Sequence, residues 1–560
     1  MFVAWVLLRD VALFLFAVGG LAMPFLPYLR RWPAAERLTL AVGGALIAGY
    51  VAAFAIYSSG IDWRWFWAAP ALGVIVGWRR AAWDAELGGP LLAYATIALW
   101  CLGWHALVVT YSGAAWQVDW WEHYDRAHFF LARWPLGFHF ADIYPLTARP
   151  PLVNLWAAAF LSGSGGAFFH YQIFMTLAAC LAVLPLAALV RRWRGDQRGL
   201  SVLVAVLMAC PLFVQNATFP WTKLVCAFFV LAAWLQLAAP DALRGRYLAA
   251  ALALAGGTLA HYSAGPWIIA LAAAWLVTRR SDWNNAGTRR EIALASVVAS
   301  VLLLTWIGWA AAHYGWRSTF ADNTTVAIAP GGDFAARVAR AAGNLFHTVW
   351  PISTVGLDHP MLAQSSALGR LRDGWFILYQ LKLWWSLGAM GGVVLLALLW
   401  RERPGRAALF ALVASVVVIV LGTVVHSHPD ALGLTHIALQ PLVLLTLAWM
   451  AARAAQLPRW LRRLWGAGLA LDFACGIALH FGVQSGLLDR WLCDVPPARI
   501  WESYTPAAAV GFENKVNLRL TFLADVSAPL WAIALLAGAM LLGMVVWRRE
   551  MTFPARPPSP

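Results

Sequence analysis

Apolar stretches long enough to cross a bilayer recur along almost the whole chain, and they constrain the fold more than any other feature. A helix of about 20 apolar residues spans the hydrocarbon core of a membrane. Of the 560 residues, 62% are hydrophobic and 12% are charged, whereas about a quarter of the residues of a soluble domain are charged. The sequence therefore excludes an ordinary soluble enzyme and predicts an all-α polytopic membrane protein of about 13–15 transmembrane helices. The candidate runs are 3–28, 38–58, 65–78, 91–112, 166–190, 199–215, 222–239, 247–262, 264–278, 291–313, 380–400, 407–425, 431–451, 465–484 and 527–547.

The basic charge indicates how these helices are oriented. The chain has 41 Lys and Arg against 26 Asp and Glu, a net charge of +15. No nucleic-acid motif accompanies this charge, so no nucleic-acid partner is predicted. In a polytopic protein, arginines concentrate in cytoplasmic loops, and we expect those loops at 30–37, 79–80, 191–198, 279–290, 401–406, 453–463 and 548–549.

The same alternation places three long segments on the opposite face. Loops longer than about 15 residues are usually functional, and we expect these three to form extended outer loops containing amphipathic helices. The predicted division is into N-terminal transmembrane helices, a module with the first outer loop, a second outer loop, further transmembrane helices, a third outer loop, and a last helix with a cytoplasmic tail. Their ranges are 1–90, 91–313 (first loop 113–165), 314–379, 380–484, 485–526 and 527–560.

Two further features of the sequence bear on the class of protein. The N-terminal apolar run has no basic leader and no small-residue cleavage site, so it is interpreted as a retained span. The six cysteines contain no CxxC pair, which indicates neither a disulfide framework nor a zinc ribbon.

Charge next to aromatic residues marks the first outer loop, which reads VDWWEHYDRAHFFL from Val118. If this stretch is helical, Glu122 lies on the face of Asp119, and Asp119 and His123 form an i,i+4 pair. Shielding by tryptophans and membrane can raise a carboxylate's pKa and make it a general base. Tyr124 and Asp125 are candidate supporting groups; the alternative is an interfacial helix with ordinary surface charges.

Further motifs follow this loop. Arg149 precedes Pro150-Pro151-Leu152, the outer turn TFPWTK ends at Lys223, and a Gly-rich segment, GGTLAHYSAGP, contains His261 and Tyr262. With the acidic motif, these features resemble the GT-C superfamily of integral-membrane glycosyltransferases, of the aminoarabinose-transferase and protein-O-mannosyltransferase type. The chain departs from the family pattern where Trp120 follows Asp119 and where Ala264 occupies a position that is often Lys.

The resemblance implies a GT-C-like bundle and an inverting sugar transfer from a polyprenyl-phosphate donor to a glycan, lipid or protein acceptor. It implies the outer face of a bacterial cytoplasmic membrane, with membrane lipids around the chain. Asp119 would be the catalytic carboxylate, with Glu122 next. The expected donor-phosphate ligands are Arg149, Lys223, His261 and Tyr262; Arg149 and Lys223 are also expected near the outer boundary, where a cation stabilises a leaving phosphate.

A short outer turn adds the ligand-type residues His426 and His428. They are interpreted either as further support for the donor phosphate or a metal, or as part of a plain connector. No cofactor is assigned, and a divalent metal stays open.

Two other functions fit a polytopic chain with outer loops: a transporter or flippase for a lipid-linked substrate, and a polysaccharide polymerase or ligase. A transporter typically has paired repeats and intramembrane charges. We find no repeat, and the acids gather in an outer loop, which favours surface chemistry.

Overall fold

The computed structural model describes the chain in separate stretches. These are residues 2–78, 85–108, 118–140, 144–194, 199–239, 243, 245–321, parts of 334–342, 370, 406–425, 435–485 and 528–552. Side chains of residues 2–4, 118–121, 194, 407, 422–425, 435–439, 483 and 551–552 lie outside this description.

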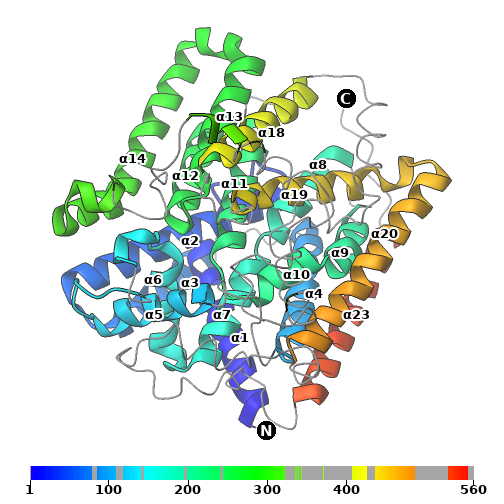
Figure 1. Cartoon of the computed structure of the whole chain (residues 1–560), viewed down its shortest axis with the longest axis horizontal. Coiled ribbons are helices and arrows are strands. Elements are labelled where there is room, and N and C mark those ends of the chain that lie inside the picture. Colours follow the sequence, from blue (N-terminus) through cyan, green and yellow to red (C-terminus); the bar gives the residue numbers. More distant parts are fainter. Residues whose placement is uncertain are drawn as a thin grey trace.

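Helices make up the described fold, and the described part of the chain contains no named strand (Figure 1). The α-helices are α1 (Phe2–Ala22), α2 (Ala34–Ser59), α3 (Ala68–Trp78), α4 (Gly88–His105), α5 (Val118–Ala132), α6 (Leu152–Ser164), α7 (Phe168–Cys180), α8 (Val183–Arg194), α9 (Leu200–Ala209), α10 (Pro211–Thr218), α11 (Lys223–Leu237), α12 (Arg246–Ala260), α13 (Ala264–Arg279), α14 (Ala286–Tyr314), α18 (Arg406–Val425), α19 (Thr435–Arg453), α20 (Arg459–Ile477) and α23 (Ala528–Thr552). Short 3₁₀ turns are η1 (Trp63–Trp67), η2 (Ala85–Leu87), η4 (Leu146–Ala148), η5 (Arg280–Asn284) and η8 (Ala454–Gln456), and π turns are η6 (Arg317–Ala321) and η9 (Ala478–Val483).

Most of the helices coincide with the predicted apolar runs, and α5 and α6 lie in the predicted first outer loop; the all-α polytopic class is confirmed. Within the described residues, seven helical stretches are long and apolar enough to cross a membrane, or eight if one bent pair counts as a span. Four shorter apolar helices accompany them, at Leu152–Ser164, Lys223–Leu237, Arg246–Ala260 and Ala408–Leu421. The predicted run 380–400 lies outside the described residues.

The bent pair has a local cause. Helix α9 ends at Ala209, Cys210 is extended with φ −91° and ψ 104°, and Pro211 begins α10. A residue before proline avoids the helical region, while proline itself suits the first position of a helix. The two helices therefore meet at a bend of 72°.

Arginine ion pairs gather at one end of the bundle. Arg192 bonds Glu36 at 2.6 Å, where α8 ends and α2 begins, and Arg191 bonds Glu86 at 2.7 Å. Arg246, at the start of α12, lies 3.4 Å from Asp282 in η5. The loops predicted to be cytoplasmic thus meet at a common end, called the arginine end below.

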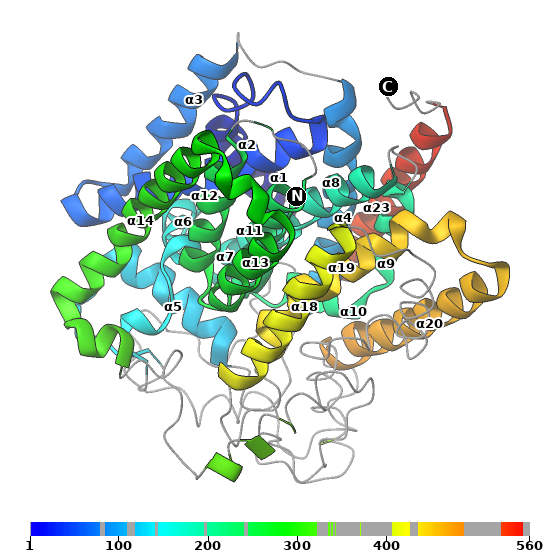
Figure 2. The same cartoon turned by 90° about the horizontal axis from the view of Figure 1, so that it is seen from above.

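The other end of the same helices is aromatic and carries the first predicted outer loop. Tyr57, near the end of α2, packs against Phe130 of α5 with ring centroids 5.0 Å apart. Tyr314, at the end of α14, donates a hydrogen bond to the Leu136 carbonyl at 2.8 Å. Helices α2 and α14 therefore run from the arginine end to the α5–α6 region. Figure 2 shows α14 and α20 at opposite edges of the bundle, with α11 between them.

Candidate functional site

Helix α5 confirms the helical spacing expected for the acidic motif. It begins at Val118 and continues to Ala132, so Asp119 lies in its first turn and Glu122 three residues later. The Asp119 side chain lies outside the described residues. Its role therefore remains a prediction made from its place on the helix.

Glu122 lies at the centre of a buried charge cluster. The Arg126 Nε and Nη2 atoms donate to Glu122 Oε1 at 3.0 Å and 2.5 Å, and neither side chain is exposed. Arg149 Nη2 lies 3.1 Å from Glu122 Oε2, and its side chain is 12% exposed. One carboxylate therefore holds two guanidinium groups, one fully buried and one at the edge of the cluster.

The aromatic rings of Phe140 and Tyr144 cover both guanidinium groups. Phe140 and Tyr144 exchange backbone hydrogen bonds of 2.8 Å and 2.9 Å. The Phe140 ring lies 4.1 Å from the Arg126 guanidinium carbon, and the Tyr144 ring lies 5.1 Å from that of Arg149. Cations over ring faces are stabilised in this geometry.

The backbone before Arg149 is held through its carbonyl oxygens. Arg126 donates to the carbonyls of Leu146 at 2.7 Å and Pro145 at 3.1 Å. The Tyr262 hydroxyl donates to the Thr147 carbonyl at 3.0 Å and accepts from Trp306 Nε1 at 3.3 Å. Side chains from α5, α14 and the α12–α13 break therefore fix a single short segment.

The Pro150 carbonyl after Arg149 is also held by a side chain. His123 Nδ1 donates to Asn154 Oδ1 at 3.1 Å, and Asn154 Nδ2 donates to the Pro150 carbonyl at 3.4 Å. Both side chains are buried. His123 thus joins the site as a backbone support one turn from Asp119.

The pKa values of this cluster depart from the sequence expectation. Burial favours the neutral form of Glu122, but the guanidinium groups of Arg149 and Arg126 outweigh it and lower its pKa to about 2. The raised pKa expected for one carboxylate of this motif is therefore not found at Glu122. Burial also lowers the pKa of His123 to about 3, against the attraction of Glu122, so that imidazole is neutral at pH 7.

Two other predicted residues extend the wall of the site. His261 and Tyr262 interrupt the backbone between α12 and α13, and Cys226 Sγ lies 3.7 Å from the His261 carbonyl. Lys223 begins α11 one turn before Cys226, is 5% exposed, and its ammonium lies over the ring of Trp221. Lys223 therefore lies beside the α12–α13 break that also carries Tyr262.

Tyr124 and Asp125 are buried on α5. The Tyr124 hydroxyl donates to the Gly166 carbonyl at 2.6 Å, in the turn between α6 and α7. Tyr124 thus anchors α5 against its neighbours and does not join the charge cluster.

The predicted His426 and His428 lie outside the described residues. No group of three or more His, Cys, Asp or Glu side chains suited to a metal ion occurs in the part of the chain that the structure describes. A divalent metal therefore stays an open alternative, as it was from the sequence.

Sequence reasoning missed Arg126, which makes the most contacts in the cluster, and Asn154. Arg126 follows Glu122 by four residues, the spacing at which opposite charges pair on a helix. That spacing alone could have predicted the Glu122–Arg126 ion pair. Nothing in the sequence pattern indicates Asn154, because its partners come from another helix and a loop.

The fold and site define a polytopic helical membrane protein with a buried ionic cluster at the aromatic end of the bundle. Among solved structures, it is similar to ArnT from Cupriavidus metallidurans bound to undecaprenyl phosphate, at 18% identity and a TM-score of 0.47, covering 83% of this chain and 77% of that one. It is also similar to the apo state of that protein, at 16% identity and a TM-score of 0.46, covering 82% and 77%. No protein-family profile and no curated protein sequence matches the chain. The function proposed next is argued from the site itself.

Proposed function

We propose that this protein is a membrane glycosyltransferase that takes a sugar from a polyprenyl-phosphate donor and transfers it to a cell-envelope acceptor. The observation that carries the proposal is Arg149. Its guanidinium lies at the edge of a buried ionic cluster, 3.1 Å from Glu122, on a segment whose carbonyls are held by other side chains. A guanidinium held in one geometry is suited to a phosphate.

Glu122 acts as a positioning residue in this proposal. A carboxylate with its pKa lowered to about 2 is ionised at any physiological pH and is a weak proton acceptor. It orients Arg149 by charge. The sequence predicted a catalytic role for Glu122. We propose instead that Glu122 supports binding of the donor phosphate by orienting Arg149.

Asp119 is the proposed base. An acceptor hydroxyl or amine attacks the anomeric carbon, the bond from that carbon to the phosphate oxygen breaks, and the lipid phosphate leaves with the bonding electrons. The acceptor proton passes to Asp119. Arg149 stabilises the negative charge that develops on the leaving phosphate. Lys223, His261 and Tyr262 are the proposed neighbours of the donor head, because they line the α11–α13 side of the same region.

The proposed location is the outer face of a bacterial cytoplasmic membrane. The cluster lies at the end of α2 and α14 away from the arginine end. Arginine-rich loops are typically cytoplasmic. The donor would therefore enter from the outer leaflet.

The test is transfer activity of purified Asp119→Asn. Mass spectrometry of envelope glycans from a deletion strain first identifies the missing sugar and acceptor, and the assay then follows release of free polyprenyl phosphate. A general base contributes about 10²- to 10⁴-fold to rate, so the variant should lose that much turnover while it stays monodisperse.

Asp62→Asn is the matched control. Asp62 is exposed and accepts a hydrogen bond of 2.8 Å from the Arg64 amide, a role that asparagine can also fill. Its activity should stay near wild type. Near wild-type transfer by Asp119→Asn would remove Asp119 as base, and movement of an intact lipid-linked sugar across the membrane would favour the transporter alternative.

A further inference from the structure

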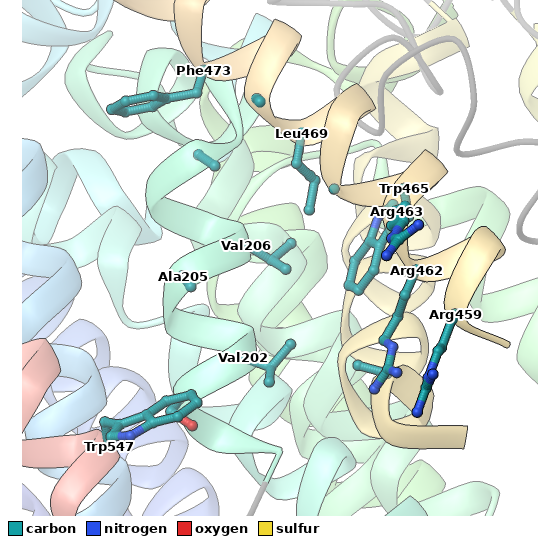
Figure 3. Close-up of a pocket in the computed structure, with 15 residues that line it drawn as sticks. Val202, Ala205, Val206, Arg459, Arg462, Arg463, Trp465, Leu469, Phe473 and Trp547 are labelled. Atoms are coloured by element: carbon teal, nitrogen blue, oxygen red, sulfur yellow. The ribbon is translucent and has the colours of Figure 1, made fainter. Parts of the chain in front are cut away.

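A second feature with ligand-binding geometry lies at the arginine end of the bundle. A groove of about 710 Å³ runs between α9 and α20, with Trp547 of α23 at its margin (Figure 3). Its walls are apolar along most of their length, with Val202 and Val206 contributed by α9 and Leu469 and Phe473 by α20. This volume falls within the range of small-molecule sites.

Three arginines line one end of the groove. Arg459, Arg462 and Arg463 lie in the first two turns of α20. None of their guanidinium groups has an ion pair or hydrogen bond to another described residue. Like charges three and four residues apart repel on a helix, and cations oppose the dipole at a helix start. The cluster is therefore electrostatically unfavourable without an anion.

An indole donor lies beside these cations. Trp465 is 4% exposed, lines the groove, and its Nε1–H has no acceptor among the described residues. Figure 3 shows it next to Arg463. A buried N–H without an acceptor is costly. A ligand oxygen at the arginine end of the groove would satisfy it.

We propose that this groove binds one anionic phospholipid from the leaflet at the arginine end. Its phosphate lies against Arg459 and Arg462, an oxygen of its head or ester region accepts from Trp465, and one acyl chain follows the apolar walls toward Phe473. The occupant is a lipid because a free phosphate would leave the apolar walls of the groove uncovered.

The length of the groove agrees with a single leaflet. From Arg459 to Phe473, helix α20 rises about 21 Å at 1.5 Å per residue. Half of a bilayer with its headgroup region measures about 20–22 Å. A lipid of ordinary chain length therefore fits from head to chain end. This site is separate from Arg149, because it lies at the opposite end of the bundle.

The test is native mass spectrometry of the full-length protein in detergent, titrated with phosphatidylglycerol or with phosphatidylcholine of the same chains. Wild type should bind one phosphatidylglycerol at least about tenfold more tightly than phosphatidylcholine. Both lipids carry the phosphate, but phosphatidylglycerol has a net negative charge, whereas the arginines repel the choline cation of phosphatidylcholine. Arg459→Ala with Arg462→Ala should remove that preference.

Arg280→Ala with Arg290→Ala is the matched control. Both arginines are exposed, and neither side chain has an ion pair or hydrogen bond to another described residue. Both lie in arginine-rich segments, yet neither lines the groove. The preference should survive in this control. Equal loss in both double variants would overturn the proposal in favour of general attraction to a basic surface.

A second variant tests the apolar walls. Ala205→Phe fills the groove and leaves the arginines intact, so it should weaken phosphatidylglycerol binding about tenfold or more. Val202→Phe repeats the test if Ala205→Phe is not monodisperse. Unchanged binding in the filled variant, or full competition by millimolar glycerol 3-phosphate, would show a site for a free phosphate head and would overturn the lipid assignment.

Discussion

The two arginine groups at opposite ends of the bundle differ in what surrounds them. Arg126 and Arg149 share one carboxylate, lie against aromatic rings and, in the case of Arg126, hold two backbone carbonyls. Arg459 and Arg462 have no comparable partner in the described structure and line an open groove. The first group has its geometry fixed before any ligand arrives, and the second gains its partner from the membrane.

This difference separates two uses of the same side chain. A fixed guanidinium can stabilise charge that appears during a reaction, because no reorganisation is needed at that moment. An exposed guanidinium without a partner among the described side chains can hold a lipid that exchanges with the bilayer. The predictions below test whether the two ends of the bundle also differ in stability, ligand binding and pH response.

The largest expected effect is on folding stability in Arg126→Met. This change leaves the buried Glu122 carboxylate with one guanidinium fewer and leaves the Leu146 and Pro145 carbonyls without their donor. Breaking a buried ion pair from one side costs about 3–5 kcal/mol. Thermal unfolding in detergent, followed by circular dichroism, should show a large drop in Tm.

The counterpart is Arg462→Ala in the groove, which should change stability by about 0.5 kcal/mol or less, as at other exposed positions. A comparable drop in Tm for the two variants would contradict the distinction between fixed and unpaired arginines.

The next effect is on donor binding in Arg149→Ala. Losing ionic hydrogen bonds to a phosphate should weaken binding of polyprenyl phosphate about 10- to 100-fold. Arg149→Lys should keep part of the affinity, because the point charge survives and only the bidentate geometry is lost. The measurement is polyprenyl-phosphate binding to purified variants.

Arg280→Ala serves as the control for this measurement, since it removes an exposed arginine from the opposite end that does not line the groove. Equal affinity for wild type, Arg149→Ala and Arg280→Ala would remove Arg149 from the donor site.

The helices of this fold were predictable because their signal is local. Apolar runs recover α2, α11 and α14 within a few residues, since each helix buries its own polar backbone and needs only a long apolar sequence in the membrane. The bend between α9 and α10 was predictable for the same reason, because Pro211 determines it locally.

The candidate site was predictable only in part. The helical spacing of Asp119, Glu122 and His123 follows from the chain order alone. The low pKa of Glu122 does not, because it depends on Arg149, which approaches from the connection between α5 and α6. The groove likewise depends on α9 meeting α20, a pairing of distant segments that no sequence pattern in either helix indicates.

A smaller effect compares close packing near the site with open space in the groove. A Cβ added to Gly49 on α2 would lie 2.0 Å from the Trp156 ring, whereas one on Gly466 of α20 would meet no atom within 4 Å. Gly49→Ala should therefore cost about 1–3 kcal/mol by overpacking. Gly466→Ala should stabilise by about 0.5–1 kcal/mol, because alanine is the better helix former. Tm shifts of the same sign in both variants would contradict the packing contrast.

The smallest expected effect is a difference in acid sensitivity at the fixed end. The folded pKa of His123 is about 3, below the value of about 6.5 in an unfolded chain. The contribution of His123 to stability is fully present above pH 6.5 and is lost as the pH falls toward 3, because the unfolded chain takes up a proton that the folded protein does not. Each pH unit below 6.5 should cost about 1.4 kcal/mol.

His123→Gln isolates this contribution. Glutamine can still donate to Asn154 Oδ1 but does not titrate, so its stability should fall less than that of wild type between pH 6.5 and 5.5. The measurement is the change in the free energy of unfolding between the two pH values. Comparing this change between wild type and His123→Gln cancels the contributions of the other titrating groups, which the two proteins share. Parallel pH dependence of wild type and His123→Gln would mean that His123 takes up a proton in the folded protein, and the neutral His123–Asn154 support of the Arg149 segment would have to be abandoned.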